Sequence, residues 1–136
     1  VVPTKDSFLS PAVYADVARE VTAELAACLA AAERAGVVRD RIALDPGVGF
    51  ATDATQSLAV LRALPRLAAL GCPLLVGVSR KSFIGAVARE PDARRRLPGS
   101  LAAGLFALSR GVAILRVHDV RETVQAVQVW TALAGA

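Results

Sequence analysis

The chain of 136 residues is long enough for a single domain with a hydrophobic core, and its 54% apolar and 21% charged residues are typical of a folded globular protein. Its formal charge of +4 is modest, and no apolar run approaches the ~18 to 20 residues of a membrane span, so we expect neither a nucleic-acid nor a membrane partner. With no basic and apolar leader at its start, a cytoplasmic setting is the default expectation.

Three further features of the sequence lead to expectations: its first residue, its two cysteines and its run of three arginines. The sequence begins at Val1 and contains no methionine, which indicates a piece of a longer protein. Cys28 and Cys72 lack metal-ligand spacing, so we expect buried thiols in a reducing compartment, and we predict no metal ligand in the chain. The run of three arginines at 94–96 has no aromatic neighbour and is predicted to be a solvated loop.

A long amphipathic helix is predicted to begin at Ser10 and Pro11, because serine caps helices and proline fits their first turn. Its apolar positions recur at steps of three and four residues until Gly36 ends it. These positions are Val13, Val17, Val21, Leu25, Cys28 and Leu29.

The first predicted strand, residues 42–44, ends at the turn signature Asp45-Pro46-Gly47. A helical stretch with regularly spaced leucines follows over 58–70. Pro65 should bend or restart this helix, and Gly71 should end it.

The second predicted strand, 74–79, leads into a short helix over 82–88 and a polar loop over 89–98. The next helix covers 100–110 and ends at Gly111.

The third predicted strand covers 112–117, and Asp119 should cap the last helix with Glu122 completing a capping box. Strands that alternate with helices at this spacing indicate right-handed crossovers and a parallel sheet covered by helices. An α/β fold follows. Half of a (β/α)8 barrel is favoured over a small open sheet, because DPGVGF at 45–50 has no phosphate-loop spacing and a whole barrel needs about 250 residues.

Polar residues follow all three predicted strands at the carboxyl edge, where ligands bind in parallel α/β proteins. Side-chain alternation places Gly77, Ser79 and Lys81 on one face and Arg80 on the other, so Arg80 is predicted to be a structural ion pair or loop anchor. The set of edge residues is Asp45, Ser79, Arg80, Lys81, Arg116, His118 and Asp119.

Arg116 and His118 share a face of the last strand with Val112 and Ile114 and suggest an anion site. For each of Lys81, Gly77 and Asp45, two interpretations remain open. Lys81 is either a solvated charge at a strand end or a ligand contact. Gly77 either relieves packing or lets a flat ligand approach the backbone, and Asp45 is either a turn residue or a carboxylate for paired ring donors.

Four stretches of the sequence together resemble the dihydropteroate synthase family, which joins a pterin to p-aminobenzoate. The combination of GVSRKSFIG with RVHDV is the most specific part of the resemblance. It implies that residues 1–136 are the C-terminal half of a (β/α)8 TIM barrel with parallel strands. The stretches are IALDPGVGF at 42–50, PLLVGVSRKSFIG at 73–85, RLPGSLAAG at 96–104 and ILRVHDVRETVQA at 114–126.

The resemblance also implies roles for individual residues. Asp45 would hold the pterin ring edge, and Lys81 would contact both substrates. Arg116 would stack along the pterin and, with His118, hold the diphosphate. Lys81 and Arg116 would be the catalytic residues. The substrate-binding set would be Asp45, Phe50, Gly77, Ser79, Lys81, Arg116 and His118, with His118 on the diphosphate and with Phe50 and Ser79 beside p-aminobenzoate.

The reaction implied by the resemblance is loss of diphosphate from 6-hydroxymethyl-7,8-dihydropterin diphosphate and attack by the amine of p-aminobenzoate, helped by Mg²⁺. The metal would be held mainly by the diphosphate and by the absent N-terminal half of the barrel. The family also implies a homodimer formed through its late helices. The 136-residue chain alone is expected to be inactive and to aggregate, because half a barrel exposes strand edges.

Two other functions remain open. One is a methyltetrahydrofolate-binding methyltransferase barrel, against which the SRK and RVHD motifs argue. The other is a non-catalytic pterin-binding paralogue. Its best support is the loop after Phe50, where Ala51-Thr52-Asp53 and Ser57 replace the Lys-Thr or Lys-Asn pair and the later Asn of the family.

Overall fold

The computed structural model describes residues 16–50 and 52–135. The predicted helix start at Ser10 and Pro11 lies outside the described residues. Helix α2 is described over Val17–Arg34, with the Asp16 carboxylate accepting the Arg19 N–H at 3.2 Å as N-cap. Its buried face matches the predicted periodicity at Val17, Val21 and Leu29, whereas Cys28 is exposed, so the expectation of a buried thiol there was wrong.

The remaining elements follow the predicted order of helices and strands. The structure breaks the second predicted helix in two at Ala63, two residues before Pro65, which confirms the restart. The polar loop at 89–98 is shorter than predicted, because it contains a 3₁₀ turn and the next helix begins at Leu97. The elements are η1 (Arg39–Arg41), α3 (Ala54–Arg62), α4 (Leu64–Ala68), β1 (Leu75–Val76), α5 (Ser82–Ala88), η2 (Ala93–Arg95), α6 (Leu97–Ser109), β2 (Ile114–Leu115) and α7 (Val120–Ala134).

The three predicted strands lie side by side and run parallel, although each is shorter than predicted. Strand β1 pairs with β2, with Leu75 opposite Ile114, and Leu44 forms a parallel bridge to Leu74 on the other side. The Leu75 N–H donates to the Leu44 carbonyl at 2.8 Å, and the Ile114 N–H donates to the Leu74 carbonyl at 3.1 Å. The parallel α/β arrangement is therefore confirmed.

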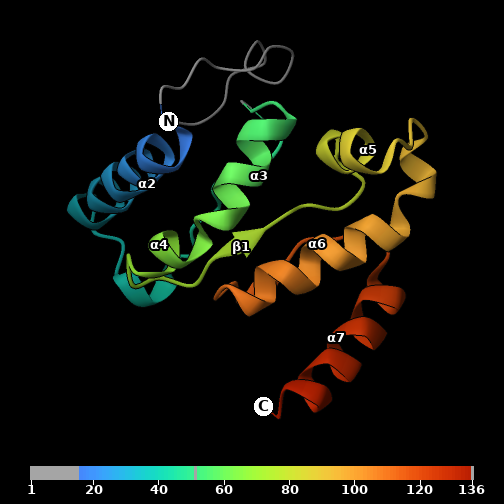
Figure 1. The fold of residues 1–136 in the computed structure, drawn as a ribbon. Helices are drawn as coiled ribbons and strands as arrows, with labels where there is room; N and C mark the ends of the chain where they lie inside the picture. The colour runs from blue at the N-terminus through green and yellow to red at the C-terminus, as the bar shows by residue number, and fades with distance from the viewer. Residues whose placement is uncertain (1–15, 51, 136) are drawn as a thin grey trace.

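The helices cover one face of this short sheet, and Figure 1 shows them arranged around β1, from α2 in blue to α7 in red. Leu74, Val76 and Val78 are at most 1% exposed, because α3, α4 and α6 supply apolar side chains to the same core. Val112 also lies in this core, so its predicted place on the face of Arg116 was wrong; its N–H bonds the Ala107 carbonyl in the turn from α6.

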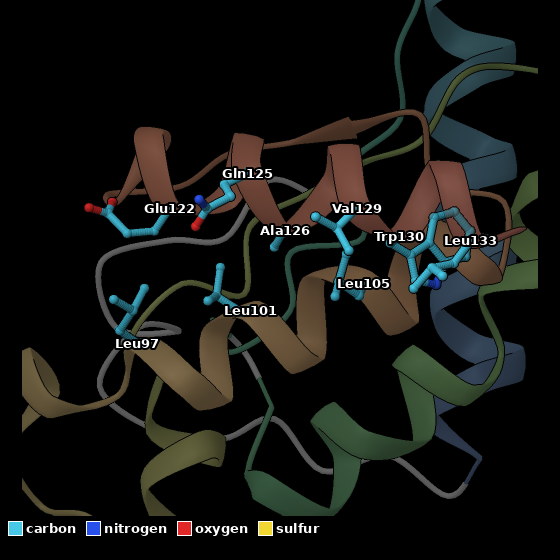
Figure 2. A pocket seen from close by; sticks show the side chains of 9 residues that line it. All are labelled: Leu97, Leu101, Leu105, Glu122, Gln125, Ala126, Val129, Trp130 and Leu133. Atoms are coloured by element: carbon cyan, nitrogen blue, oxygen red, sulfur yellow. The ribbon is translucent and has the colours of Figure 1, made fainter.

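Helices α6 and α7 pack against one another and border an apolar groove of about 520 Å³. Figure 2 shows Leu97, Leu101 and Leu105 of α6 facing residues of α7, among them Val129 and Trp130. The groove holds none of the predicted site residues. Among the described ranges, no helix has both the length and the apolar character needed to cross a bilayer.

The fully buried Leu74 gives a test of this core in the whole protein. Leu74→Ala should lower the free energy of unfolding by about 2 to 5 kcal/mol, because a cavity is left where two strand contacts meet. Val87→Ala on α5 is the control, since Val87 is 64% exposed and should change stability by less than about 1 kcal/mol. Urea unfolding measures both, and equal losses would contradict the described core.

Candidate functional site

The exposed face of the sheet collects the polar residues that follow each strand segment. Asp45 follows the bridge at Leu44, Ser79 lies three residues beyond β1, and Arg116 follows β2 directly. Because the segments are parallel, these residues emerge at the same edge, as the sequence predicted.

An ion pair joins the first and last of these segments. Arg116 Nη1 donates to Asp45 Oδ2 at 3.0 Å, and the Gly47 N–H donates to Asp45 Oδ1 at 2.8 Å. Both carboxylate oxygens therefore accept a hydrogen bond within the chain. The pair is solvent-accessible, with side chains 52% exposed for Arg116 and 33% for Asp45, so a ligand can reach it.

Gly77 provides the space in which the Arg116 guanidinium lies. A Cβ built on Gly77 would be 2.7 Å from Nη2 of Arg116, closer than Cβ atoms of folded proteins approach a neighbour, and 3.1 Å from Cζ, which is a tight contact. The structure thus shows packing relief for an arginine at this position. A role for Gly77 in direct ligand contact stays a prediction.

Ser79 and His118 form a second contact across the same edge. Ser79 Oγ lies 2.8 Å from His118 Nδ1, and the His118 backbone N–H points to the same hydroxyl at 3.3 Å. When the hydroxyl donates to Nδ1, the neutral imidazole carries its proton on Nε2. The ring then has a donor available for an anion.

Lys81 reaches the edge from a turn and not by continuing the strand. Its ammonium donates to the Val48 carbonyl and lies 4.2 Å from the centre of the Phe50 ring. A Cβ on Gly49 would be 2.8 Å from Lys81 Cδ, so this glycine makes room for the lysine stem. The predicted neighbours Phe50 and Lys81 therefore lie together.

The pKa of Lys81 is lowered from 10.5 to about 8 in this environment. Burial is the main cause, because it disfavours the charged amine, and the positive charge of Arg116 adds to it. Asp45 acts in the opposite direction. The amine is thus still mostly protonated at pH 7 but loses its proton at lower pH than an ordinary lysine.

The loop after Phe50 is closed by residues that depart from the resembled family. Thr52 Oγ1 accepts the Gly49 N–H at 3.1 Å and lies 2.9 Å from Ser57 Oγ, which is buried. Asp53 caps α3 in a capping box with Gln56. These side chains organise the backbone that carries Phe50.

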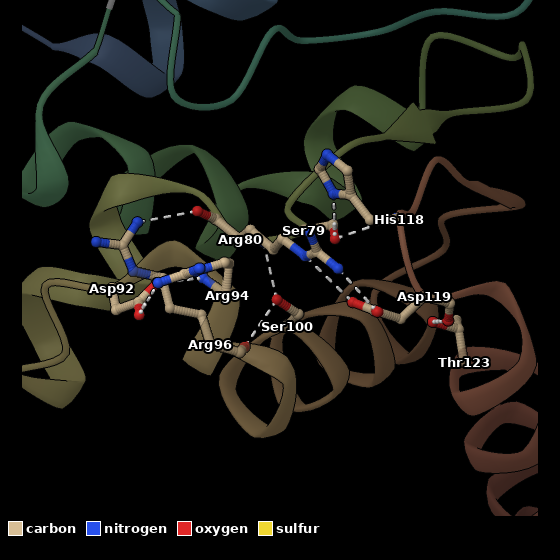
Figure 3. A network of polar contacts seen from close by, with 9 residues as sticks. All are labelled: Ser79, Arg80, Asp92, Arg94, Arg96, Ser100, His118, Asp119 and Thr123. Atoms are coloured by element: carbon tan, nitrogen blue, oxygen red, sulfur yellow. Dashed lines mark hydrogen bonds and ion pairs between the residues drawn. The ribbon is translucent and has the colours of Figure 1, made fainter.

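Arg80 is an ion-pair anchor, as the sequence predicted. Its guanidinium donates to Asp119 at 2.9 Å and 3.4 Å, and Figure 3 shows this pair beside Ser79 and His118. The predicted capping box of Asp119 with Glu122 was wrong, because the Asp119 carboxylate makes no cap hydrogen bond to α7 and contacts Arg80 instead.

Several contacts at this edge were missed from the sequence. The Val48 carbonyl and Gly49 lie within the IALDPGVGF stretch, but the residue type does not reveal which backbone carbonyl will accept a hydrogen bond. Arg96 was assigned to a solvated loop, and this was wrong: Arg94 and Arg95 are exposed, whereas Arg96 donates to three backbone carbonyls. The sequence signal for a structural role of Arg96 was its place in the RLPGSLAAG stretch, which carries part of the family resemblance.

The acidic side chains of this edge do not suit a metal ion. Among residues 16–50 and 52–135, no three His, Cys, Asp or Glu side chains gather as metal ligands would. Asp45 is engaged with Arg116 and Gly47, and Asp119 is engaged with Arg80. The described donor set therefore does not fit a divalent cation by itself.

The pterin binding enzyme family model matches residues 3–118, which include every predicted site residue from Asp45 to His118. The chain belongs to the pterin binding enzyme family. The match confirms the family proposed from the four sequence stretches.

Curated and solved members of the pterin binding enzyme family agree with this assignment. Dihydropteroate synthase of Neisseria meningitidis serogroup C is 47% identical over 122 residues, which are 89% of this chain and 42% of that protein. Dihydropteroate synthase of Xanthomonas albilineans with 4-aminobenzoic acid has a TM-score of 0.90 at 42% identity and covers 92% of this chain and 46% of that one.

The same Xanthomonas albilineans enzyme in complex with 7,8-dihydropteroate has a TM-score of 0.89 at 43% identity, over 91% of this chain and 47% of that one. The parallel strands and their helices are thus part of a (β/α)8 barrel. The chain spans a little under half the length of these relatives.

The lowered pKa of Lys81 predicts a pH effect in this pterin binding enzyme. In ¹³C-methylated whole protein, the Lys81 amine should titrate near pH 8, and its resonance should be missing from Lys81→Met. Between pH 8 and 10.5 the unfolded chain binds more protons at this position, so wild type should gain stability relative to Lys81→Met as pH rises. Titration near 10.5 would contradict the described burial.

Proposed function

We propose that the whole protein containing this chain is a dihydropteroate synthase. It would condense 6-hydroxymethyl-7,8-dihydropterin diphosphate with p-aminobenzoate to give 7,8-dihydropteroate and diphosphate. The observation that carries the proposal is that Asp45, Lys81 and Arg116 converge at one edge in a chain 47% identical to a relative of that name.

Asp45 is proposed to bind the donor edge of the pterin. A carboxylate accepts two parallel N–H bonds from an amidine-like ring edge, which gives both affinity and orientation. Its oxygens already accept from Gly47 and Arg116, and the accessible Arg116 side chain can yield one position to the ligand. The contact with Gly47 keeps the carboxylate oriented during this exchange.

Arg116 and His118 are proposed to receive the leaving diphosphate. The reaction breaks the bond between the pterin methylene carbon and a diphosphate oxygen, so negative charge accumulates on that oxygen. A guanidinium and an imidazole N–H at the same edge stabilise this charge more in the transition state than in the ground state. Ser79 orients the imidazole through its 2.8 Å contact with Nδ1.

Lys81 and Phe50 are proposed to lie where the two substrates meet. The amine nitrogen of p-aminobenzoate forms the new bond to the methylene carbon and then loses a proton. The Phe50 ring offers an apolar surface to the aromatic acid, and the Lys81 ammonium above it supplies positive charge near the reacting atoms. Direct contact of Gly77 with the pterin completes the proposed set.

The proposal extends to Mg²⁺, location and assembly. We infer that any Mg²⁺ is held by the substrate diphosphate and by residues outside this chain, since the donor set described here does not fit it. We also infer a cytoplasmic homodimer. Exposed apolar side chains on α7, such as Val129 at 56% and Leu133 at 83%, support a contact through the late helices.

Substitution of the two proposed catalytic cations tests the function. In the whole protein, Lys81→Ala and Arg116→Ala should each lower kcat/KM for dihydropteroate formation by on the order of 100-fold or more, because each removes charge that stabilises the transition state. Arg121→Ala on the exposed surface of α7 is the matched control and should leave turnover unchanged.

The same assay separates the competing functions. Near-normal turnover by either variant would rule out the assigned roles. A wild-type protein that binds pterin but forms no dihydropteroate would favour the non-catalytic paralogue. Methyl transfer from methyltetrahydrofolate would favour the methyltransferase barrel.

A further inference from the structure

Arg80 has an unusual backbone for a residue with a side chain. Its φ is +59°, in the left-handed region that costs an L-residue conformational energy, and it stands between Ser79 and Lys81. Such a conformation persists when the surroundings hold it in place. It ends the extended segment after β1 and directs Lys81 back over the sheet edge.

Ser100, near the start of α6, holds the amino side of Arg80. The Arg80 N–H donates to Ser100 Oγ at 2.8 Å, and that hydroxyl donates in turn to the Arg96 carbonyl at 2.8 Å. Ser100 is 9% exposed, so this chain of hydrogen bonds competes little with water.

Arg96 holds the carboxyl side of the same residue. Its Nη1 donates to the Arg80 carbonyl at 2.9 Å, while its other nitrogens donate to the carbonyls of Glu90 at 3.0 Å and Pro91 at 3.2 Å. The guanidinium lies against Gly85, where a Cβ would overlap it. One side chain thus ties the turn before α5 to the loop after it, and Figure 3 shows its contact with Arg80.

The two peptide groups that flank Arg80 carry the site residues Ser79 and Lys81. A rotation at Arg80 would move Lys81 away from the Val48 carbonyl and from the Phe50 ring, which it contacts now. We propose that Arg96 and Ser100 are positioning residues, which hold Arg80 in its left-handed conformation and thereby place Lys81 against Phe50. Neither residue belongs to the proposed substrate-binding set.

The positioning role deepens the proposed function, and its effect on turnover rests on that function. The titration midpoint of Lys81 is a second measurement, which does not depend on the proposed function. In ¹³C-methylated whole protein, Arg96→Gln and Ser100→Ala should raise the titration midpoint of Lys81 from about 8 toward 10.5, because the released amine moves into water. Both variants should lower kcat for dihydropteroate formation by about 10-fold or more, with a smaller effect on KM.

Two further variants separate positioning from general destabilisation. Ser100→Thr keeps the hydroxyl and should retain the wild-type Lys81 midpoint. Arg94→Gln is the matched control, since Arg94 is exposed and contacts Asp92 on the same loop, and it should change neither midpoint nor turnover.

A Lys81 midpoint that stays near 8 in folded Arg96→Gln and Ser100→Ala would overturn the positioning role, whatever the turnover. If the Lys81 midpoint rises in these variants but the wild-type protein forms no dihydropteroate, the result would support positioning and contradict the proposed function.

Discussion

Parallel alignment of three short strand segments determines where Asp45, Ser79 and Arg116 emerge. Leu44, β1 and β2 run in the same direction, so the residues that follow them meet at one edge. The apolar face beneath, including Leu74 and Val76, is covered by helices and keeps the segments in register. Asp45 and Arg116, 71 positions apart in sequence, therefore form one ion pair.

Two cations of this region, Lys81 and Arg116, each lie over a glycine. Lys81 packs on Gly49 and Arg116 packs on Gly77, and in both cases an added Cβ would be closer than 3 Å to the side chain. The absence of a Cβ lets a long charged side chain lie flat along the backbone, which limits its rotamers and shields its stem. The chain thus orders these two cations before any ligand binds.

Much of this arrangement could be predicted from the sequence, and the reasons for success and failure differ. The alternation of strands with helices predicted the edge of the sheet at which Asp45 and Arg116 emerge. The alternation of side chains along a strand predicted the face of the sheet on which each one lies. The left-handed turn at Arg80 could not be predicted, because local preferences disfavour it and distant hydrogen bonds from α6 hold it. The role of Arg96 was also missed, because its hydrogen-bond partners are backbone carbonyls, which a sequence pattern does not identify.

The central claim is that the strand ends form one site for a pterin and an aromatic acid. A crystal structure of the whole protein with a pterin and p-aminobenzoate bound tests it most directly. The account predicts the pterin ring edge within hydrogen-bond distance of the Asp45 carboxylate, with the Lys81 amine between the two ligands. Both ligands bound away from Asp45, Lys81 and Arg116 would contradict it.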